Sequence, residues 1–303
     1  MANNVSTHKA ASTSFPQVQT RGTIDKLEFY TNNYIRLVDF EKRVKSISIP
    51  GKPKGLNDRH SYIAILENGK ECGIYVRRYG DNFKYINHFI TNPSFFNTYK
   101  EYLSKLHEFI TPGELSDTRI SRLDLTVDYN LPFNKLITGI DILYKSVWVN
   151  YLGKSQNITG MLIGKGSEKF NIYDKTLKST LSYPCTRIEC QLRGEKLPFK
   201  EISKLTSLIT AVENKNPFDI ITVHETHLNQ KDLNWGKKDL ERYYKFEVLI
   251  ENFGFYLSRK ILNPNRNFKK EYSKFFWIEK YSQQPSKIIL VGLGRFFEQD
   301  VNI

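Results

Sequence analysis

The stretch Arg122-Leu-Asp124-Leu-Thr-Val-Asp128 decides the fold class of this chain. Polar and apolar residues alternate along it, and alternate side chains of a strand point to opposite faces of a sheet. The pattern therefore predicts a strand with one face on a core and one polar face. Two later stretches repeat the alternation: Asn171-Ile-Tyr173-Asp-Lys175 and Arg187-Ile-Glu189-Cys-Gln-Leu-Arg193.

The rest of the chain divides into a strand-rich part and a helical part. Short alternating runs before residue 90 predict further strands, and Asn68-Gly69 is a hairpin signal between two of them. Helical spacing predicts helices at about 95–110, 132–145, beyond Pro198 and over 239–262. Strands followed by helices are typical of an α+β protein. We expect a flexible tail over 1–20, an antiparallel-sheet domain over 21–195 and a mainly helical, basic region over 196–303.

The composition favours a polyanionic partner. The 303 residues include 45 Lys and Arg against 32 Asp and Glu, which gives a net charge of +13. A charge of this size favours nucleic acid as the partner. The alternative is that the charge only keeps the protein soluble. No apolar run approaches the roughly 18 residues of a membrane span, the N-terminus has no hydrophobic signal core, and three Cys cannot form a disulfide framework. We therefore expect a cytoplasmic protein with no membrane partner.

Three carboxylates stand on the polar faces of the predicted strands. If the strands are neighbours, Asp124, Asp128 and Glu189 gather on one surface. Such hard oxygen ligands suit Mg²⁺ or Mn²⁺. The alternative is an ordinary wet sheet face whose acids and bases pair across strands, and the pattern leaves it open.

Tyr173 lies among these residues and is the first candidate for a nucleophile. A Tyr beside a metal that polarises a phosphodiester can attack it and form a covalent phosphotyrosine. Lys175 could position phosphate or balance charge beside it. Arg side chains on the same faces suit bidentate phosphate binding, namely Arg122, Arg187 and Arg193. Tyr183, Tyr272 and Tyr281 are the next candidates for the nucleophile.

A basic segment near the C-terminus is a second candidate nucleic-acid surface. Its bases, opposed by Glu271 alone, are Arg259, Lys260, Arg266, Lys269, Lys270 and Lys274. Aromatic residues between them could stack on unpaired bases; a solvated helix face beside core aromatics is the alternative. Arg77 and Arg78 form a smaller candidate patch. The pair His224-Glu-Thr-His227 lacks the further ligands of a zinc site.

The three polar stretches, taken in order, resemble the motifs of rolling-circle replication initiation proteins. They are most similar to the initiation factors of Gram-positive plasmids and the gene II-type initiators of filamentous phages. The resemblance implies a fold like the HUH endonucleases, although the His-hydrophobic-His motif is absent. It also implies an enzyme that nicks and rejoins one strand at an origin through a covalent phosphotyrosine, so 21–195 would be catalytic and 196–303 would bind DNA.

The resemblance further implies DNA, as origin duplex and single strand, together with a host helicase and polymerase as partners in a bacterial cell. A homodimer is possible. Two other functions stay open: a relaxase for conjugative transfer, which uses the same chemistry, and a non-catalytic DNA-binding regulator.

Overall fold

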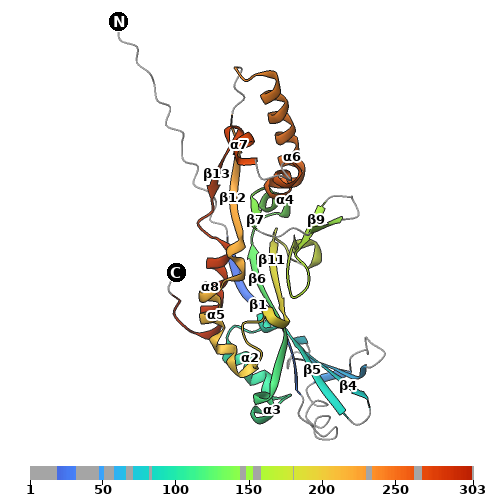
Figure 1. Ribbon diagram of the computed structural model, residues 1–303. Helices are drawn as coiled ribbons and strands as arrows, with labels where there is room; N and C mark the ends of the chain where they lie inside the picture. Colours follow the sequence, from blue (N-terminus) through green and yellow to red (C-terminus); the bar gives the residue numbers. More distant parts are fainter. Residues whose placement is uncertain are drawn as a thin grey trace.

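The computed structural model describes residues 19–31, 48–50, 58–65, 71–81, 84–143, 148–152, 158–179, 181–229, 234–262 and 268–301. Within them, ten strands form a large antiparallel sheet in the order β2-β3-β4-β5-β1-β6-β11-β10-β9-β8, and three form a smaller sheet in the order β13-β12-β7 (Figure 1). The α+β class predicted from the sequence is confirmed.

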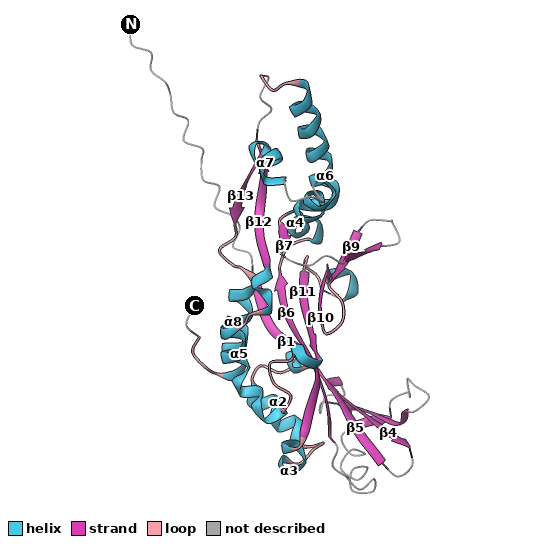
Figure 2. Ribbon diagram, in the orientation of Figure 1, coloured by secondary structure: helices cyan, strands magenta, loops and turns pink. Residues whose placement is uncertain are grey.

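The strands of the large sheet are β1 (Thr20–Thr31), β2 (Ser48–Pro50), β3 (Asp58–Ile65), β4 (Glu71–Asp81), β5 (Lys84–Thr91), β6 (Thr118–Tyr129), β8 (Trp148–Leu152), β9 (Ile158–Ile163), β10 (Glu168–Asp174) and β11 (Thr186–Arg193). Those of the smaller sheet are β7 (Ile140–Ile142), β12 (Ile221–Leu228) and β13 (Phe276–Lys280). The α-helices are α2 (Tyr99–His107), α3 (Pro112–Ser116), α4 (Phe133–Thr138), α5 (Leu208–Asn214), α6 (Lys237–Leu262), α7 (Phe268–Tyr272) and α8 (Pro285–Phe297). Figure 2 shows how these helices and strands are distributed.

The central strands bury the apolar half of their alternating pattern. Leu123, Leu125 and Val127 of β6 are fully buried, and Ile188 and Cys190 of β11 join them in the same core. Helices α5 and α8 lie along this side of β1 and β6 (Figure 1). The opposite side of the strands is thereby left to the polar residues.

Helix α8 and strand β1 pack backbone against backbone through two glycines. A Cβ atom on Gly22 would overlap the backbone of Ile288 and Ile289, and one on Gly292 would overlap the backbone of Gly22. Gly292, which the sequence shows to be no part of a dinucleotide-binding motif, therefore has a packing role.

The C-terminal third contributes to two cores. Residues of α5 and α8, such as Leu208 and Leu293, share the core of the sheet. A second core is built from the aromatic residues of α6, α7 and the segment that follows, including Phe246 and Phe275. The functional division at residue 195 stays a prediction, and the packing joins the two sides of that position.

The helix expected over 132–145 is shorter than predicted. Helix α4 ends at Thr138, and β7 begins two residues later. Gly139 accepts a backbone hydrogen bond from His224, so the chain leaves the helix there and pairs with β12. Ile140 and Ile142, two positions apart as on one face of a strand, are both buried there.

Other expectations fall partly or wholly outside the described residues. Strands β3 and β4 pair antiparallel, as the Asn68-Gly69 signal predicts, although the turn itself is not described. Of the predicted tail only residues 19 and 20 are described, and Arg266 is not. No helix in the described part of the chain is both long and apolar enough to cross a membrane.

Candidate active site

The three motif strands are neighbours in the sheet, in the order β6, β11, β10. The register places Arg187 directly opposite Asp128 on one side and Tyr173 on the other. Because directly opposite residues of an antiparallel pair share a face, these side chains form a row across the sheet. The adjacency that the sequence argument required is confirmed.

Arg187 is the centre of a buried ion-pair network. Its Nε and Nη2 atoms donate to Oδ1 and Oδ2 of Asp128 at 2.6 and 2.9 Å, and its Nη1 donates to Asp25 Oδ1 at 2.6 Å. Lys175 Nζ donates to Asp128 Oδ2 at 2.8 Å. Burial alone would raise the pKa of Asp128, but Arg187 and Lys175 hold it below its ordinary value. These four residues are called the Arg187 network below.

Arg122 forms a second network on the same face. Its Nε donates to Asp124 Oδ1 at 2.7 Å, and its Nη1 donates to Glu28 Oε1 at 3.2 Å. Asp124 is only 1% exposed, and burial raises the pKa of its carboxyl against the opposing effect of Arg122. Arg122, Asp124 and Glu28 are called the Arg122 network below.

The predicted metal ligands are distributed between these networks. Asp124 and Asp128 are four positions apart on β6, which corresponds to about 13 Å along a strand. Among the described residues, no group of three or more His, Cys, Asp or Glu side chains is arranged to hold a metal ion. The triad of Asp124, Asp128 and Glu189 stays a prediction.

Glu189, which lies between the networks, is the carboxylate that best fits a cation. Burial, followed by the charges of Asp124 and Asp25, raises its pKa to about 7. Directly opposite, the buried Oδ1 of Asn171 has no hydrogen-bond partner in the described residues. A carboxylate under like-charge repulsion beside an unpartnered amide oxygen is a donor pair suited to a hard divalent ion.

Tyr173 occupies the end of the row beside Arg187. It is 9% exposed, and the ammonium group of Lys178 lies 3.8 Å from the centre of its ring. Burial raises the pKa of the phenol well above its ordinary value, and Arg187 opposes this effect. The hydroxyl is thus close to positive charge but largely withdrawn from solvent.

The other tyrosine candidates differ in their surroundings. Tyr183, in the connection between β10 and β11, is 47% exposed. Tyr272 belongs to the second core, and Tyr281 is half-buried. Tyr102, on the helix expected over about 95–110, is buried in the main core, where its hydroxyl lies 2.9 Å from that of Thr91.

Two carboxylates of the site had no motif to mark them. Glu28 stands opposite Arg122 on β1. Asp25 lies where the β1–β6 register shifts between Ile24 and Lys26, and it contacts the polar-face residue Arg187. The polar alternation around Glu28 could have indicated that residue, but a local register shift has no reliable sequence signal.

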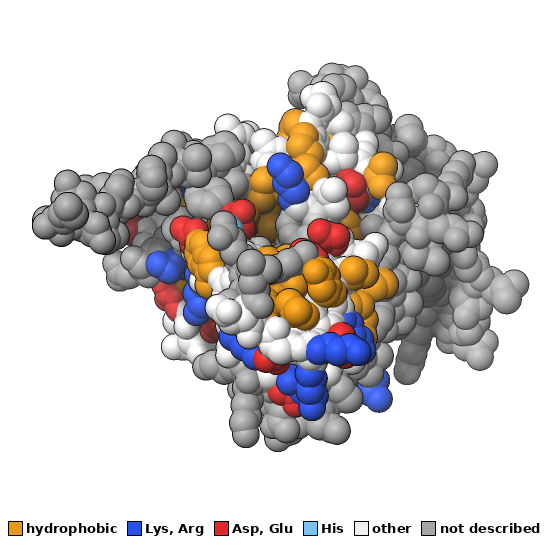
Figure 3. Space-filling model, turned by 90° about the horizontal axis from the view of Figure 1, so that it is seen from above, with side chains coloured by type: hydrophobic (Ala, Val, Ile, Leu, Met, Phe, Trp, Pro, Cys, Tyr) orange, Lys and Arg blue, Asp and Glu red, His pale blue; other side chains and the backbone are white. Residues whose placement is uncertain are grey.

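The candidate DNA-binding bases are partly engaged by acids. Arg259 pairs with Asp141 at 2.7 Å, and Lys274 pairs with Asp239 at 2.6 Å. Arg193, whose side chain is 42% exposed, lies 3.8 Å from Glu28. In Figure 3, basic and acidic side chains are intermixed around an apolar patch. The side chains of Arg77, Arg78, Lys269 and Lys270 are outside the described part, and Lys260 lies over the Tyr256 ring.

His224 and His227 lie on strand β12. His224 packs edge-on against Phe255, and burial lowers its pKa to about 4. His227 stacks on the exposed Trp277 with ring centres 3.9 Å apart. Both therefore have aromatic packing partners.

One solved structure that resembles this chain is a rolling-circle replication initiator protein from Geobacillus stearothermophilus. The two are 14% identical, the match covers 71% of this chain and 90% of that one, and the TM-score is 0.43. No protein-family model matches the chain, and no curated protein does.

Proposed function

We propose that this protein nicks and rejoins one DNA strand at a replication origin and so starts rolling-circle replication of a phage or plasmid. The observation that carries the proposal is the row of Asp128, Arg187 and Tyr173 on three adjacent strands, next to Glu189 and Asn171. This row joins a phenol, a phosphate-binding guanidinium and candidate cation ligands on one rigid surface.

In the proposed reaction, Tyr173 Oη forms a bond to phosphorus while the bond from phosphorus to the 3′ oxygen breaks. The phenolic proton passes to solvent, and the leaving oxygen takes up a proton to become the 3′ hydroxyl that primes synthesis. Arg187 and Lys175 orient the phosphate by exchanging part of their contact with Asp128 for contact with its oxygens. Attack of the 3′ hydroxyl on the phosphotyrosine reverses these steps and rejoins the strand.

Glu189 and Asn171 would hold Mg²⁺ or Mn²⁺, and of the two further predicted ligands, Asp124 and Asp128, only one would reach the same ion, because they lie about 13 Å apart along β6. Such an ion supplies positive charge for the phosphorane oxygens. The residues of the chain then have to position the scissile phosphate and exclude competing water.

A nicking assay tests the proposal. Its substrate is a supercoiled plasmid carrying the DNA that flanks the protein's own gene, with Mg²⁺ or Mn²⁺. We expect wild type to relax it and to leave a covalent protein–DNA band on a denaturing gel, while Tyr173→Phe does neither. Tyr183→Phe is the matched control, since this more exposed tyrosine lies in the next connection. Equal activity of wild type and Tyr173→Phe would refute the nucleophile assignment.

A non-catalytic DNA-binding regulator is the second candidate, and the burial of Tyr173 favours it. It would be supported if wild type binds the plasmid but neither nicks it nor forms a covalent band. A relaxase would nick in the same way, so it is distinguished by cleavage at a conjugative transfer origin.

A further inference from the structure

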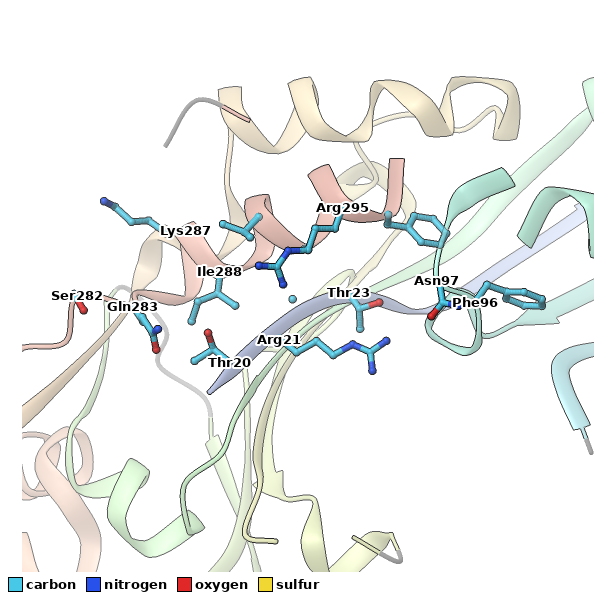
Figure 4. A pocket seen from close by; sticks show the side chains of 14 residues that line it. Thr20, Arg21, Thr23, Phe96, Asn97, Ser282, Gln283, Lys287, Ile288 and Arg295 are labelled. Carbon is cyan, nitrogen blue, oxygen red and sulfur yellow. The ribbon is translucent and has the colours of Figure 1, made fainter. Parts of the chain in front are cut away.

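A groove lies between strand β1 and helix α8, at the edge of the sheet. It has a volume of about 550 Å³ and is lined by Arg21, Thr23, Gln283, Lys287 and Arg295, among others. Figure 4 shows Arg21 on the strand and Arg295 on the helix bordering the same space, with Lys287 near one end. Strand β1 and helix α8, which meet at Gly22 and Gly292, thus both contribute to the walls of the groove.

The lining is chemically biased toward anions. Three of its side chains are cationic, none is acidic, and Thr20, Thr23, Ser282 and Asn97 add hydrogen-bonding groups. The sheet face beside it differs, because there each arginine is paired with a carboxylate. An anion in the groove would therefore not have to displace an acidic partner from the lining.

The half of β1 that borders the groove has no second strand partner in the described part of the chain. β5 pairs with β1 from Leu27 to Thr31, whereas residues 20–24 pair with β6 alone. Helix α8 packs against this half at Gly22, and Arg21 is exposed near its end.

The groove and the row of the candidate active site share Arg21, at the edge of the sheet. Arg21 stands directly opposite Asp128, which stands opposite Arg187, which stands opposite Tyr173. Three strand spacings separate Arg21 from Tyr173, or about 14 Å. An extended DNA strand attached at Tyr173 would cross two strands to reach Arg21 and then pass around the edge of β1, because α8 packs on the other side of the sheet.

We infer that this groove binds the phosphates of single-stranded DNA next to the scissile position. The inference rests on the proposed function and adds to it a second contact site for the strand. Its volume of about 550 Å³ falls in the range of about 300–1,000 Å³ of small-molecule sites, so it has room for a short stretch of unpaired strand.

The test measures binding of a short fluorescein-labelled oligo-dT by fluorescence anisotropy over a range of salt concentrations. The variant is Arg295→Gln with Lys287→Gln, and the control is Lys204→Gln with Lys215→Gln, which removes two exposed charges outside the groove. Each phosphate contact contributes about 0.7 to the slope of log K against log[salt] for single strands. The groove variant should therefore lower the slope by about 1.4, and its affinity loss between about 50 and 200 mM salt should be about sevenfold smaller.

The control should keep the wild-type slope, and Arg295→Lys, which retains the charge, should keep most of it. Equal slopes for wild type and the groove variant, with thermal melts showing both folded, would overturn the inference. So would an equal effect on duplex DNA, competition by a free nucleoside triphosphate but not by oligo-dT, or no binding of oligo-dT by wild type. Because this readout needs no nicking, a protein that binds through the groove but does not cut would refute only the proposed function.

Discussion

Removing the guanidinium of Arg187 should destabilise the protein strongly at neutral pH. Arg187 is 6% exposed and supplies three hydrogen bonds to Asp128 and Asp25, so Arg187→Gln leaves two carboxylates with little compensating charge. Breaking a buried ion pair in this way costs about 3–5 kcal/mol. Lys175 still contacts Asp128, which places the expected loss toward the lower end of that range.

The stability lost in Arg187→Gln should also depend on pH, and the pKa of Asp128 determines whether the loss grows or shrinks as the pH falls. In wild type this pKa is below its ordinary value of 3.8, so the pairing adds stability above that pH and loses it as the pH falls through the native value. Without Arg187, burial favours the protonated carboxyl, so the variant binds a proton at higher pH than wild type does. The difference between the two proteins should therefore shrink from about pH 7 to about pH 4.

Urea denaturation followed by tryptophan fluorescence at both pH values measures this difference. Arg193→Gln is the matched control on the same strand, because its half-exposed side chain should cost less than about 1 kcal/mol. A loss below about 1 kcal/mol for Arg187→Gln, or one that does not change with pH, would show that the network does not carry this energy.

Two further substitutions test the cation site and the helix contact. Because the raised pKa of Glu189, about 7, favours its protonated form in the folded state, wild type should lose stability as the pH rises from about 4.5 to about 7, and Glu189→Gln should remove this dependence. At about pH 8, Mn²⁺ should raise the Tm of wild type but not of Glu189→Gln, and equal shifts would contradict the assignment of Glu189 as a ligand. Gly292→Ala should lower stability by about 1–3 kcal/mol in a thermal melt, since its methyl group would overlap the backbone of Gly22. Gly113→Ala, which meets nothing within 4 Å, should not, and equal melts for the two would refute the close packing of α8 on β1.

The strands of the site could be predicted because alternation is a local property. β11 (Thr186–Arg193) contains the whole of the third polar stretch, Arg187 to Arg193, and Leu123, Leu125 and Val127 of β6 are fully buried. The pairing of Arg122 with Asp124 could also have been anticipated, since residues two apart on a strand share a face. The sequence pattern was therefore sufficient to predict those features that depend on the residues of a single strand.

The sequence pattern could not predict features that depend on contacts between segments far apart in the chain. The register shift that brings Asp25 to Arg187 depends on how β1 meets β6, about 100 residues later in the chain. The helix expected over 132–145 was cut short because β12 offers Ile140 and Ile142 a strand to pair with. In both cases tertiary pairing overrode a local preference.

The balance of charge on the polar face sets a condition for DNA binding there. In the two networks, four carboxylates (Asp25, Glu28, Asp124 and Asp128) pair with three cations (Arg122, Lys175 and Arg187), and Arg193, 3.8 Å from Glu28, is a fourth cation beside them. These charges cancel, and Glu189 adds negative charge as it ionises near pH 7. The net charge of +13 therefore does not arise from these networks. A phosphodiester would be attracted to this face only if a cation is held near Glu189 or if bases beside the face, such as those of the β1–α8 groove, hold the strand. Removing either source alone should weaken binding of a single strand, and removing both should leave the phosphate facing a surface with no positive excess.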